Sequence, residues 1–339
     1  MVWARNINLK CAFLNAENLF LLFDHPPQPP LHQYDEKTWQ KLSTSVFENK
    51  PLKKSFELAR AILEINPDIL MLCEVGGLES LKNFNEYFLN STYSPILIEG
   101  NSDRNIDVGF LIRKNLPFYY NLLSNKTRLI NYLYPHERQS QQAGFALKVS
   151  SHKFSRDCAE LRFFEKDQDK PFFIILLTHL KSRLDPDRID PGGAERRAAE
   201  FKAVLEIYNE LLTQFPEVPV AVCGDFNGNA SRHGTDEEFA SLYQNSDLED
   251  ILESAQTPLE ERATFYQVRN GGRSEGRQID FCFLNEKLRP FCDSKKSFVY
   301  RYKDEFGFAY EAPTTLESKM RLPSDHYPLV FELTQLPYW

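Results

Sequence analysis

The chain has 339 residues, enough for one large mixed α/β domain or for two ordinary ones. Apolar residues make up 42% and charged residues 26%, a balance that predicts a globular protein and excludes a largely disordered one. The formal charge of −8 argues against a protein that coats nucleic acid through its overall field, although a local basic rim around an acidic site remains compatible with it.

Targeting signals and cysteine clusters are missing from the sequence. The first ten residues hold no apolar run followed by a small-residue cleavage site, and no later run approaches the ~18 residues of a membrane span. We therefore expect a cytoplasmic protein without a membrane span. No Cys-x-x-Cys pair occurs, so the scattered cysteines are predicted to be buried thiols rather than disulfides or zinc ligands.

The N-terminal part alternates between regular elements and one irregular segment. Apolar and polar residues alternate over 7–14, which predicts a strand. A Pro-rich stretch then opens an insertion at about 25–50, which we interpret as a surface loop rather than a domain linker. Apolar residues three and four apart predict an amphipathic helix over 51–65, which Asn66 and Pro67 should end.

Four continuous apolar runs predict strands that are covered on both faces, and each carries polar groups at or near one end. These are 69–73 before Glu74, 172–177 before Thr178 and His179, 218–223 before Gly224-Asp225-Phe226-Asn227, and 278–284 around Asp280. Helices are predicted at 78–89 and 194–212, and further strands near 106–112, 143–149, 263–268 and 327–333. Because no repeat or composition break occurs, we expect a single domain over 1–339 with an α/β sandwich of two sheets.

The polar groups at these strand ends favour a shared site, although each motif alone has a simpler explanation. Residues 224–229 have the composition of a turn, and 324–328 can form an Asx or ST turn. Strand ends that each present Asp, Glu, Asn or His would, however, gather these groups at one rim of the sheets. Carboxylates gathered there need a cation, and oxygen ligands without a thiolate suit Mg²⁺ or Mn²⁺.

The order of the motifs resembles the endonuclease/exonuclease/phosphatase superfamily, over residues 7–333. The matching blocks are Asn15-x-Glu17-Asn18-Leu19, Glu74, Ile106-Asp107-Val108-Gly109, Thr178-His179-Leu180-Lys181-Ser182-Arg183, Gly224-Asp225-Phe226-Asn227, Ile279-Asp280-Phe281 and Ser324-Asp325-His326. The resemblance implies a deoxyribonuclease I-like, four-layer α/β sandwich, with two packed mixed sheets flanked by helices. It also implies a Mg²⁺- or Mn²⁺-dependent phosphoesterase, with one or two ions left open.

The resemblance implies which residues bind the metal and which position the attacking water. It implies that Glu74 is the principal metal ligand, with Asp325 and Asn15 close to the metal and Asn15 also beside the phosphate. Asp225 and Asn227 match the pair that positions the water and the scissile phosphate, with Asp225 as a candidate base. Glu17 is a further supporting residue in the same block.

The two histidines match groups that contact the phosphate. The resemblance implies that Asp280 holds His326 in the correct tautomer, and it makes Asp107 a candidate partner of His179. Lys181 and Arg183 follow His179 closely and are predicted to bind substrate phosphate.

Basic residues farther along the chain are not assigned to the site. Arg196, Arg197 and Lys202 could extend a basic rim, but we interpret them as a solvated helix face.

The leading hypothesis is a nuclease that cleaves DNA or RNA by attack of a metal-activated water. The blocks 103–108 and 179–183 look most like a poorly characterised bacterial nuclease group. One alternative is a phosphoesterase for a small phosphodiester, a phospholipid head group or a nucleotide, and a second is a non-catalytic binding module on the same fold. Endonuclease and exonuclease action stay open, and no protein partner can be inferred.

Overall fold

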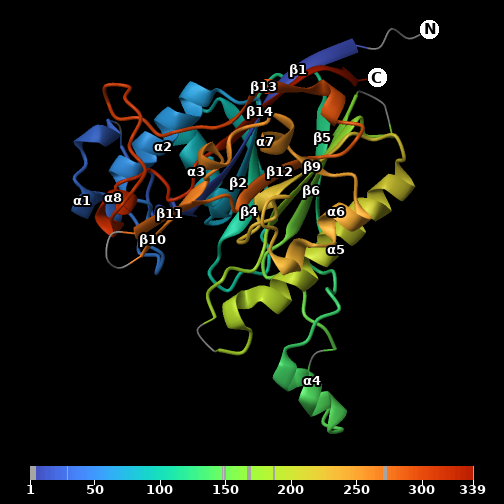
Figure 1. The fold of residues 1–339 in the computed structure, drawn as a ribbon. Helices are drawn as coiled ribbons and strands as arrows, with labels where there is room; N and C mark the ends of the chain where they lie inside the picture. Colours follow the sequence, from blue (N-terminus) through green and yellow to red (C-terminus); the bar gives the residue numbers. More distant parts are fainter. Residues whose placement is uncertain are drawn as a thin grey trace.

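The computed structural model describes residues 5–28, 30–146, 148, 150–165, 169–185, 188–269 and 273–338. Within them, two six-stranded mixed sheets pack face to face between layers of helices, which confirms the predicted fold class (Figure 1). The first sheet has the order β13-β14-β1-β2-β4-β3, and the second has the order β5-β6-β7-β8-β12-β9.

The strands of the first sheet come from both ends of the chain. They are β1 (Arg5–Leu19), β2 (Ile69–Val75), β3 (Tyr93–Leu97), β4 (Asp107–Arg113), β13 (Cys292–Val299) and β14 (Leu329–Tyr338). The second sheet contains β5 (Tyr119–Ser124), β6 (Cys158–Phe164), β7 (Phe173–His179), β8 (Val220–Asp225), β9 (Glu249–Asp250) and β12 (Asp280–Leu284), and a separate ribbon contains β10 (Phe265–Arg269) and β11 (Arg273–Arg277). Because β14 pairs with β1, strands from the two ends of the chain lie side by side in the interior of this sheet.

The helices cover the outer faces of the sheets. The long helices α2 (Leu52–Ile65) and α3 (Gly77–Phe88) lie over the first sheet, and α5 (Ala194–Gln214) lies over the second. The short helices are α1 (Glu36–Gln40), α4 (Pro135–Gln142), α6 (Leu242–Asn245), α7 (Ile251–Ser254) and α8 (Leu316–Met320). In Figure 1, α4 projects away from the body of the molecule. Among the described residues, no helix is both long and apolar enough to cross a membrane.

Buried strands deliver the polar groups to one rim, as their sequences predict. Every residue of β7 and β8 is buried, since both strands are covered by the first sheet on one face and by α5 on the other. The two strands are parallel, with His179 beside Asp225, and β12 runs antiparallel to β8 with Asp280 beside Asp225. In the first sheet β1 and β2 are also parallel, with Asn15 beside Cys73.

Two expectations about local structure were wrong. The strand predicted near 143–149 is not formed where the structure describes that range: Ala143 caps α4, Gly144 follows in a left-handed turn, and residues 147 and 149 lie outside the described residues. The insertion at 25–50 is more than a surface loop, because Trp39 is fully buried against Phe23 and Phe88. An aromatic residue in an irregular segment carries no periodicity that could have revealed this packing.

Candidate active site

Asp225 lies at the centre of the polar cluster. Its Oδ2 accepts a hydrogen bond from Asn15 Nδ2 at 3.0 Å, and its Oδ1 accepts one from the backbone N–H of Asn227 at 2.8 Å. His179 Nε2 lies 3.5 Å from Oδ2, and His326 Nε2 lies 4.0 Å from it. Burial, together with the nearby charge of Asp280, raises the pKa of Asp225 to about 7. Groups from both sheets therefore converge on one buried carboxyl group.

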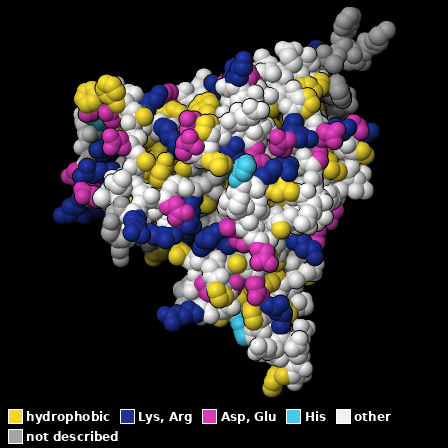
Figure 2. Space-filling model, viewed as in Figure 1, with side chains coloured by type: hydrophobic (Ala, Val, Ile, Leu, Met, Phe, Trp, Pro, Cys, Tyr) yellow, Lys and Arg dark blue, Asp and Glu magenta, His cyan; other side chains and the backbone are white. Residues whose placement is uncertain are grey.

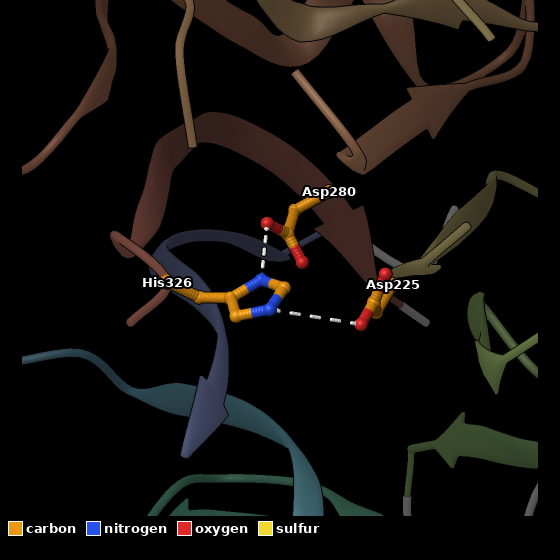
Figure 3. A group of neighbouring side chains, drawn as sticks. All are labelled: Asp225, Asp280 and His326. Carbon is orange, nitrogen blue, oxygen red and sulfur yellow. Dashed lines mark hydrogen bonds and ion pairs between the residues drawn. The ribbon is translucent and has the colours of Figure 1, made fainter. Parts of the chain in front are cut away.

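Asp280 and His326 form a buried pair directed at Asp225 (Figure 3). His326 Nδ1 lies 2.8 Å from Asp280 Oδ2, so an N–H at Nδ1 donates to the carboxylate and leaves Nε2 facing Asp225. Thr264 Oγ1 accepts from the backbone N–H of Asp280 at 3.2 Å, and Tyr302 donates to the His326 carbonyl at 2.7 Å. Burial lowers the pKa of His326, but the Asp280 carboxylate outweighs it and holds the pKa well above its usual range.

Glu74 is held in an unusual backbone conformation beside this cluster. Its φ is 60°, in the left-handed region, and its half-buried carboxylate accepts one hydrogen bond, from the N–H of Asn18 at 3.0 Å. Within the described part of the chain, no Lys or Arg forms an ion pair with Glu74. A carboxylate that is constrained in this way and has no ion-pair partner has the character of a ligand for a hard cation.

Asp325 and Asn15 complete a set of oxygen donors. Asp325 lies 3.2 Å from Lys319 Nζ and 3.9 Å from His326 Nε2. Burial raises the pKa of Asp325, but His326 and Lys319 together lower it below its usual value, so the group is a carboxylate at neutral pH. The carbonyl of Asn15 accepts from Ser324 Oγ at 2.7 Å, which ties the first strand to the loop that carries Asp325. This chemistry fits Mg²⁺ or Mn²⁺ better than zinc.

A second donor set nearby also has the spacing for a metal ion. Single ligand atoms of Asp225, Asp280 and His326 all lie within 4.8 Å of one another. The hydrogen bond between Asp280 and His326 already uses both groups, so we interpret this set as an acid–histidine pair facing a carboxyl group rather than as a metal centre.

His179 is neutral, and its expected partner is elsewhere. Burial, followed by the positive charge of Arg156, holds the pKa of His179 well below its usual range. Its Nδ1 is buried without a hydrogen-bond partner among the described residues. The predicted pairing with Asp107 was wrong: the side chain of Asp107 accepts from the Gly100 N–H at 2.7 Å and thereby fixes the loop that precedes β4.

Glu17 lies in the left-handed bend at the end of β1. Its carboxylate lies 2.9 Å from Lys54 Nζ and 3.6 Å from Lys50 Nζ. Lys50 is itself buried and donates to the carbonyls of Ala16 and Glu17 at 2.9 and 3.0 Å. The insertion at 25–50 thus ends in a lysine that holds the bend between Asn15 and Asn18, a contact that a sequence pattern gives no means to predict.

The two basic residues after His179, Lys181 and Arg183, make different contacts. Lys181 Nζ donates to the carbonyls of Ser182 and Leu184, whereas Arg183 donates to the Asn227 carbonyl at 3.0 Å and pairs with Asp236. They line two different cavities, of about 720 Å³ and about 330 Å³ respectively. On the face shown in Figure 2, Lys and Arg side chains are interspersed with Asp and Glu.

The predicted solvated face of α5 was wrong for Arg197. This side chain is buried, pairs with Glu238 and donates to the carbonyls of Lys181 and Gly192 at 3.0 Å each. It therefore fixes the loop after His179 to the helix. Arg196 is partly buried and donates to the Tyr134 hydroxyl at 2.9 Å, while Lys202 is exposed as expected.

Comparison with solved structures identifies the architecture. The human Nocturnin catalytic domain, solved with a bound sulfate anion, is similar with a TM-score of 0.55 and 18% identity, over 98% of this chain and 96% of that one. An endonuclease/exonuclease/phosphatase family protein from Bacteroides thetaiotaomicron is similar with a TM-score of 0.53 and 17% identity, over 98% of this chain and 99% of that one. The chain therefore has the deoxyribonuclease I-like fold that the sequence resemblance implied.

The likeness to deoxyribonuclease I-like structures lies in three dimensions more than in sequence. A mannosyl-6-phosphatase from the same Bacteroides species is similar with a TM-score of 0.53 and 17% identity, over 96% of this chain and 99% of that one. No family model matches the sequence, and no curated protein is significantly similar to it. At these identities the comparison shows the deoxyribonuclease I-like fold, and the chemistry must be argued from the site.

Arg156 is a further residue at the site that its sequence context does not reveal. It is only 6% exposed, and its charge lies close enough to His179 to lower the pKa of that histidine. Arg156 stands in an irregular segment before β6, so neither periodicity nor a motif distinguishes it from any surface arginine.

Proposed function

We propose that the protein is a metal-dependent phosphodiester hydrolase, with a nucleic acid as its leading substrate class, and that the whole chain works as one domain. The observation that carries the proposal is the convergence on Asp225 of Asn15, Asn227, His179 and the Asp280–His326 pair. A protein that only binds a ligand has no need for a buried carboxyl group with a pKa near 7 that faces two histidines.

The residues of the site have different roles in the proposed reaction. A divalent cation bound by Glu74, with Asp325 and Asn15 close to it, would neutralise charge on the phosphate and on the leaving oxygen. Asp225, with a pKa of about 7, accepts a proton from the attacking water near neutral pH. Asn227 and Asn15 fix the orientation of this carboxylate.

The two histidines have different charges and therefore different tasks. His326, kept protonated by Asp280, donates a hydrogen bond to a phosphate oxygen as negative charge develops there. His179 is neutral and buried, so it contributes a directed hydrogen bond without a full charge. Attack by water leaves no covalent intermediate on the chain.

A nucleic acid is preferred over a smaller substrate because basic side chains line cavities next to the site, among them Lys181 and Arg183. The similar mannosyl-6-phosphatase supports the alternative of a small phosphate ester. The two alternatives differ in salt dependence, because binding of a nucleic acid weakens steeply as salt rises.

Activity measurements on a substrate panel test the proposal. The panel contains plasmid DNA, single-stranded DNA, RNA, a bis-aryl phosphate, a sugar phosphate and sphingomyelin, each with Mg²⁺, Mn²⁺, Ca²⁺ or EDTA. We expect cleavage that EDTA abolishes and that Glu74→Gln and His326→Ala reduce strongly, with the exposed Arg321→Gln as a control. If no phosphoester is cleaved, the proposed hydrolase activity is wrong and the binding-module alternative is supported. If both site variants cleave like the wild type, the proposed active site is wrong.

A further inference from the structure

We propose that the cavity of about 720 Å³ beside the candidate active site binds a second phosphate of the substrate, adjacent to the scissile ester. We call it the side pocket; Arg104, Tyr134, Lys153, Arg156, Lys181 and Arg196 are among its lining residues. The inference rests on the proposed function and narrows its substrate class. The preferred substrate is then a nucleotide chain with a neighbouring phosphate, rather than an isolated diester.

Arg156 is the central observation. Its Nη1 donates to Ser155 Oγ at 3.2 Å and more weakly to the Leu180 carbonyl at 3.4 Å, and its Nε is buried without a partner. Among the described residues, no carboxylate lies within ion-pair distance of this guanidinium. The carboxylates of Glu200, Glu74 and Asp225 stabilise this charge only from beyond ion-pair distance. A buried guanidinium without a direct counter-ion is costly, so its place in the wall of a cavity indicates an anionic ligand.

Three acidic residues line the side pocket: Asp103 is exposed, whereas the carboxylates of Asp185 and Asp190 are already engaged by backbone groups. Both carboxylate oxygens of Asp190 accept backbone N–H groups of Glu195 and Arg196, each at 3.0 Å, at the start of α5. Asp185 accepts from the N–H groups of Ile189 and Asp190 at 3.1 Å each.

The buried Glu200 is engaged by backbone groups and by Arg196, whose Nε lies 3.4 Å from the carboxylate. Its carboxylate accepts from the N–H groups of Ser155 and Lys181 at 2.7 Å each. Lys181 Nζ, in contrast, is bound only by carbonyl groups among the described residues. The charges left to face a ligand are therefore mainly positive.

Hydrogen bonds at two points connect residues of the side pocket to the candidate active site. The Leu180 carbonyl accepts from Arg156 on one side and from Asn227 Nδ2, at 3.1 Å, on the other. At a second point, Arg104 donates to the Asn18 side chain at 2.8 Å, and the Asn18 N–H binds the Glu74 carboxylate. One ligand can thus place one phosphate at the site and the next phosphate against Arg156, where a guanidinium forms paired hydrogen bonds with phosphate oxygens.

The test compares three dinucleotides that differ only in an added phosphate: TpT, pTpT with a 5′-phosphate and TpTp with a 3′-phosphate. We expect kcat/KM for pTpT or for TpTp to exceed that for TpT by about 10- to 100-fold, as one charge-assisted contact would give. Arg156→Met should bring this ratio close to one, Arg156→Lys should restore part of it, and Arg321→Gln should leave it unchanged. Circular dichroism and thermal unfolding check that the variants fold.

Binding with EDTA present separates this inference from the proposed hydrolysis. Titration calorimetry should show that the preferred phosphorylated dinucleotide binds more tightly than TpT, and that Arg156→Met abolishes the difference. If no dinucleotide is cleaved but this binding pattern holds, the hydrolase proposal fails and the side pocket stands. Equal binding of all three dinucleotides, or a preference that folded Arg156→Met retains, would overturn the side pocket.

Discussion

Replacing Asp280 with Asn tests whether its carboxylate is needed for catalysis rather than for folding. Asp280 is fully buried, one oxygen binds His326 Nδ1 at 2.8 Å, and the other has no partner among the described residues. An asparagine of the same shape can still accept the His326 N–H, but it removes the negative charge that keeps this histidine protonated. We therefore expect a folded protein with a poorly active site.

The magnitudes follow from the two roles of the carboxylate. Loss of a buried ion pair behind a charged histidine should raise the barrier by about 3–5 kcal/mol, which is roughly a 10²- to 10⁴-fold loss of kcat. Unfolding free energy should change by no more than about 1–2 kcal/mol in either direction, since the charge that disappears was itself costly to bury.

Asp250 supplies a matched control for this experiment. It is also a fully buried aspartate with one unpartnered oxygen, and its strand β9 pairs with the same strand β12, but it lies outside the candidate site. Steady-state rates on a cleaved substrate and urea unfolding would be measured for both Asn variants. Equal loss of activity in Asp280→Asn and Asp250→Asn, or full activity in Asp280→Asn, would refute the role given to Asp280.

Three further predictions concern stability and are checked by urea unfolding. Burial raises the pKa of Asp250 to about 7, so the folded state binds the extra proton. The free energy of unfolding should fall by up to about 4 kcal/mol as pH rises from about 4 to 7, and Asp250→Asn should remove that fall. The same pH dependence in the wild type and in the variant would contradict this prediction. Lys50→Met should destabilise by about 1–3 kcal/mol, because the Ala16 and Glu17 carbonyls lose their donor; no change would show that water replaces it. Trp39→Ala should cost about 3–5 kcal/mol, and a value below about 1 would mean that the insertion is not part of the core.

The buried strands and the groups at their ends could be predicted because their signals are local. The runs that form β2, β7, β8 and β12 are continuously apolar in sequence and are almost entirely buried in the structure. Parallel pairing of β7 with β8 then places His179 beside Asp225 without any further information. A local pattern is sufficient wherever a residue's environment is set by its own strand.

Other features depend on contacts between distant parts of the chain and leave no local trace. The edge strand β5 has exposed and half-buried residues, so its sequence lacks the continuous apolar run of the inner strands. Arg197 resembles any helix-surface arginine until Glu238, 41 residues later, provides its partner. Lys50 likewise becomes a buried lysine only because the bend at 15–18 presents its carbonyls.

Four residues at the site have a strained backbone conformation that the sequence does not reveal. Glu17, Asn18, Glu74 and Asn227 all have φ between 50° and 60°, a conformation that costs a non-glycine residue about 1 kcal/mol or more. Asparagine adopts this conformation more readily than glutamate, so nothing in the sequence marks Glu74 as left-handed. The conformation is held by the Asn18 N–H on Glu74, while Lys50 stabilises the adjoining bend. The insertion at 25–50 therefore contributes to the geometry of the candidate metal ligand, although it supplies no ligand itself.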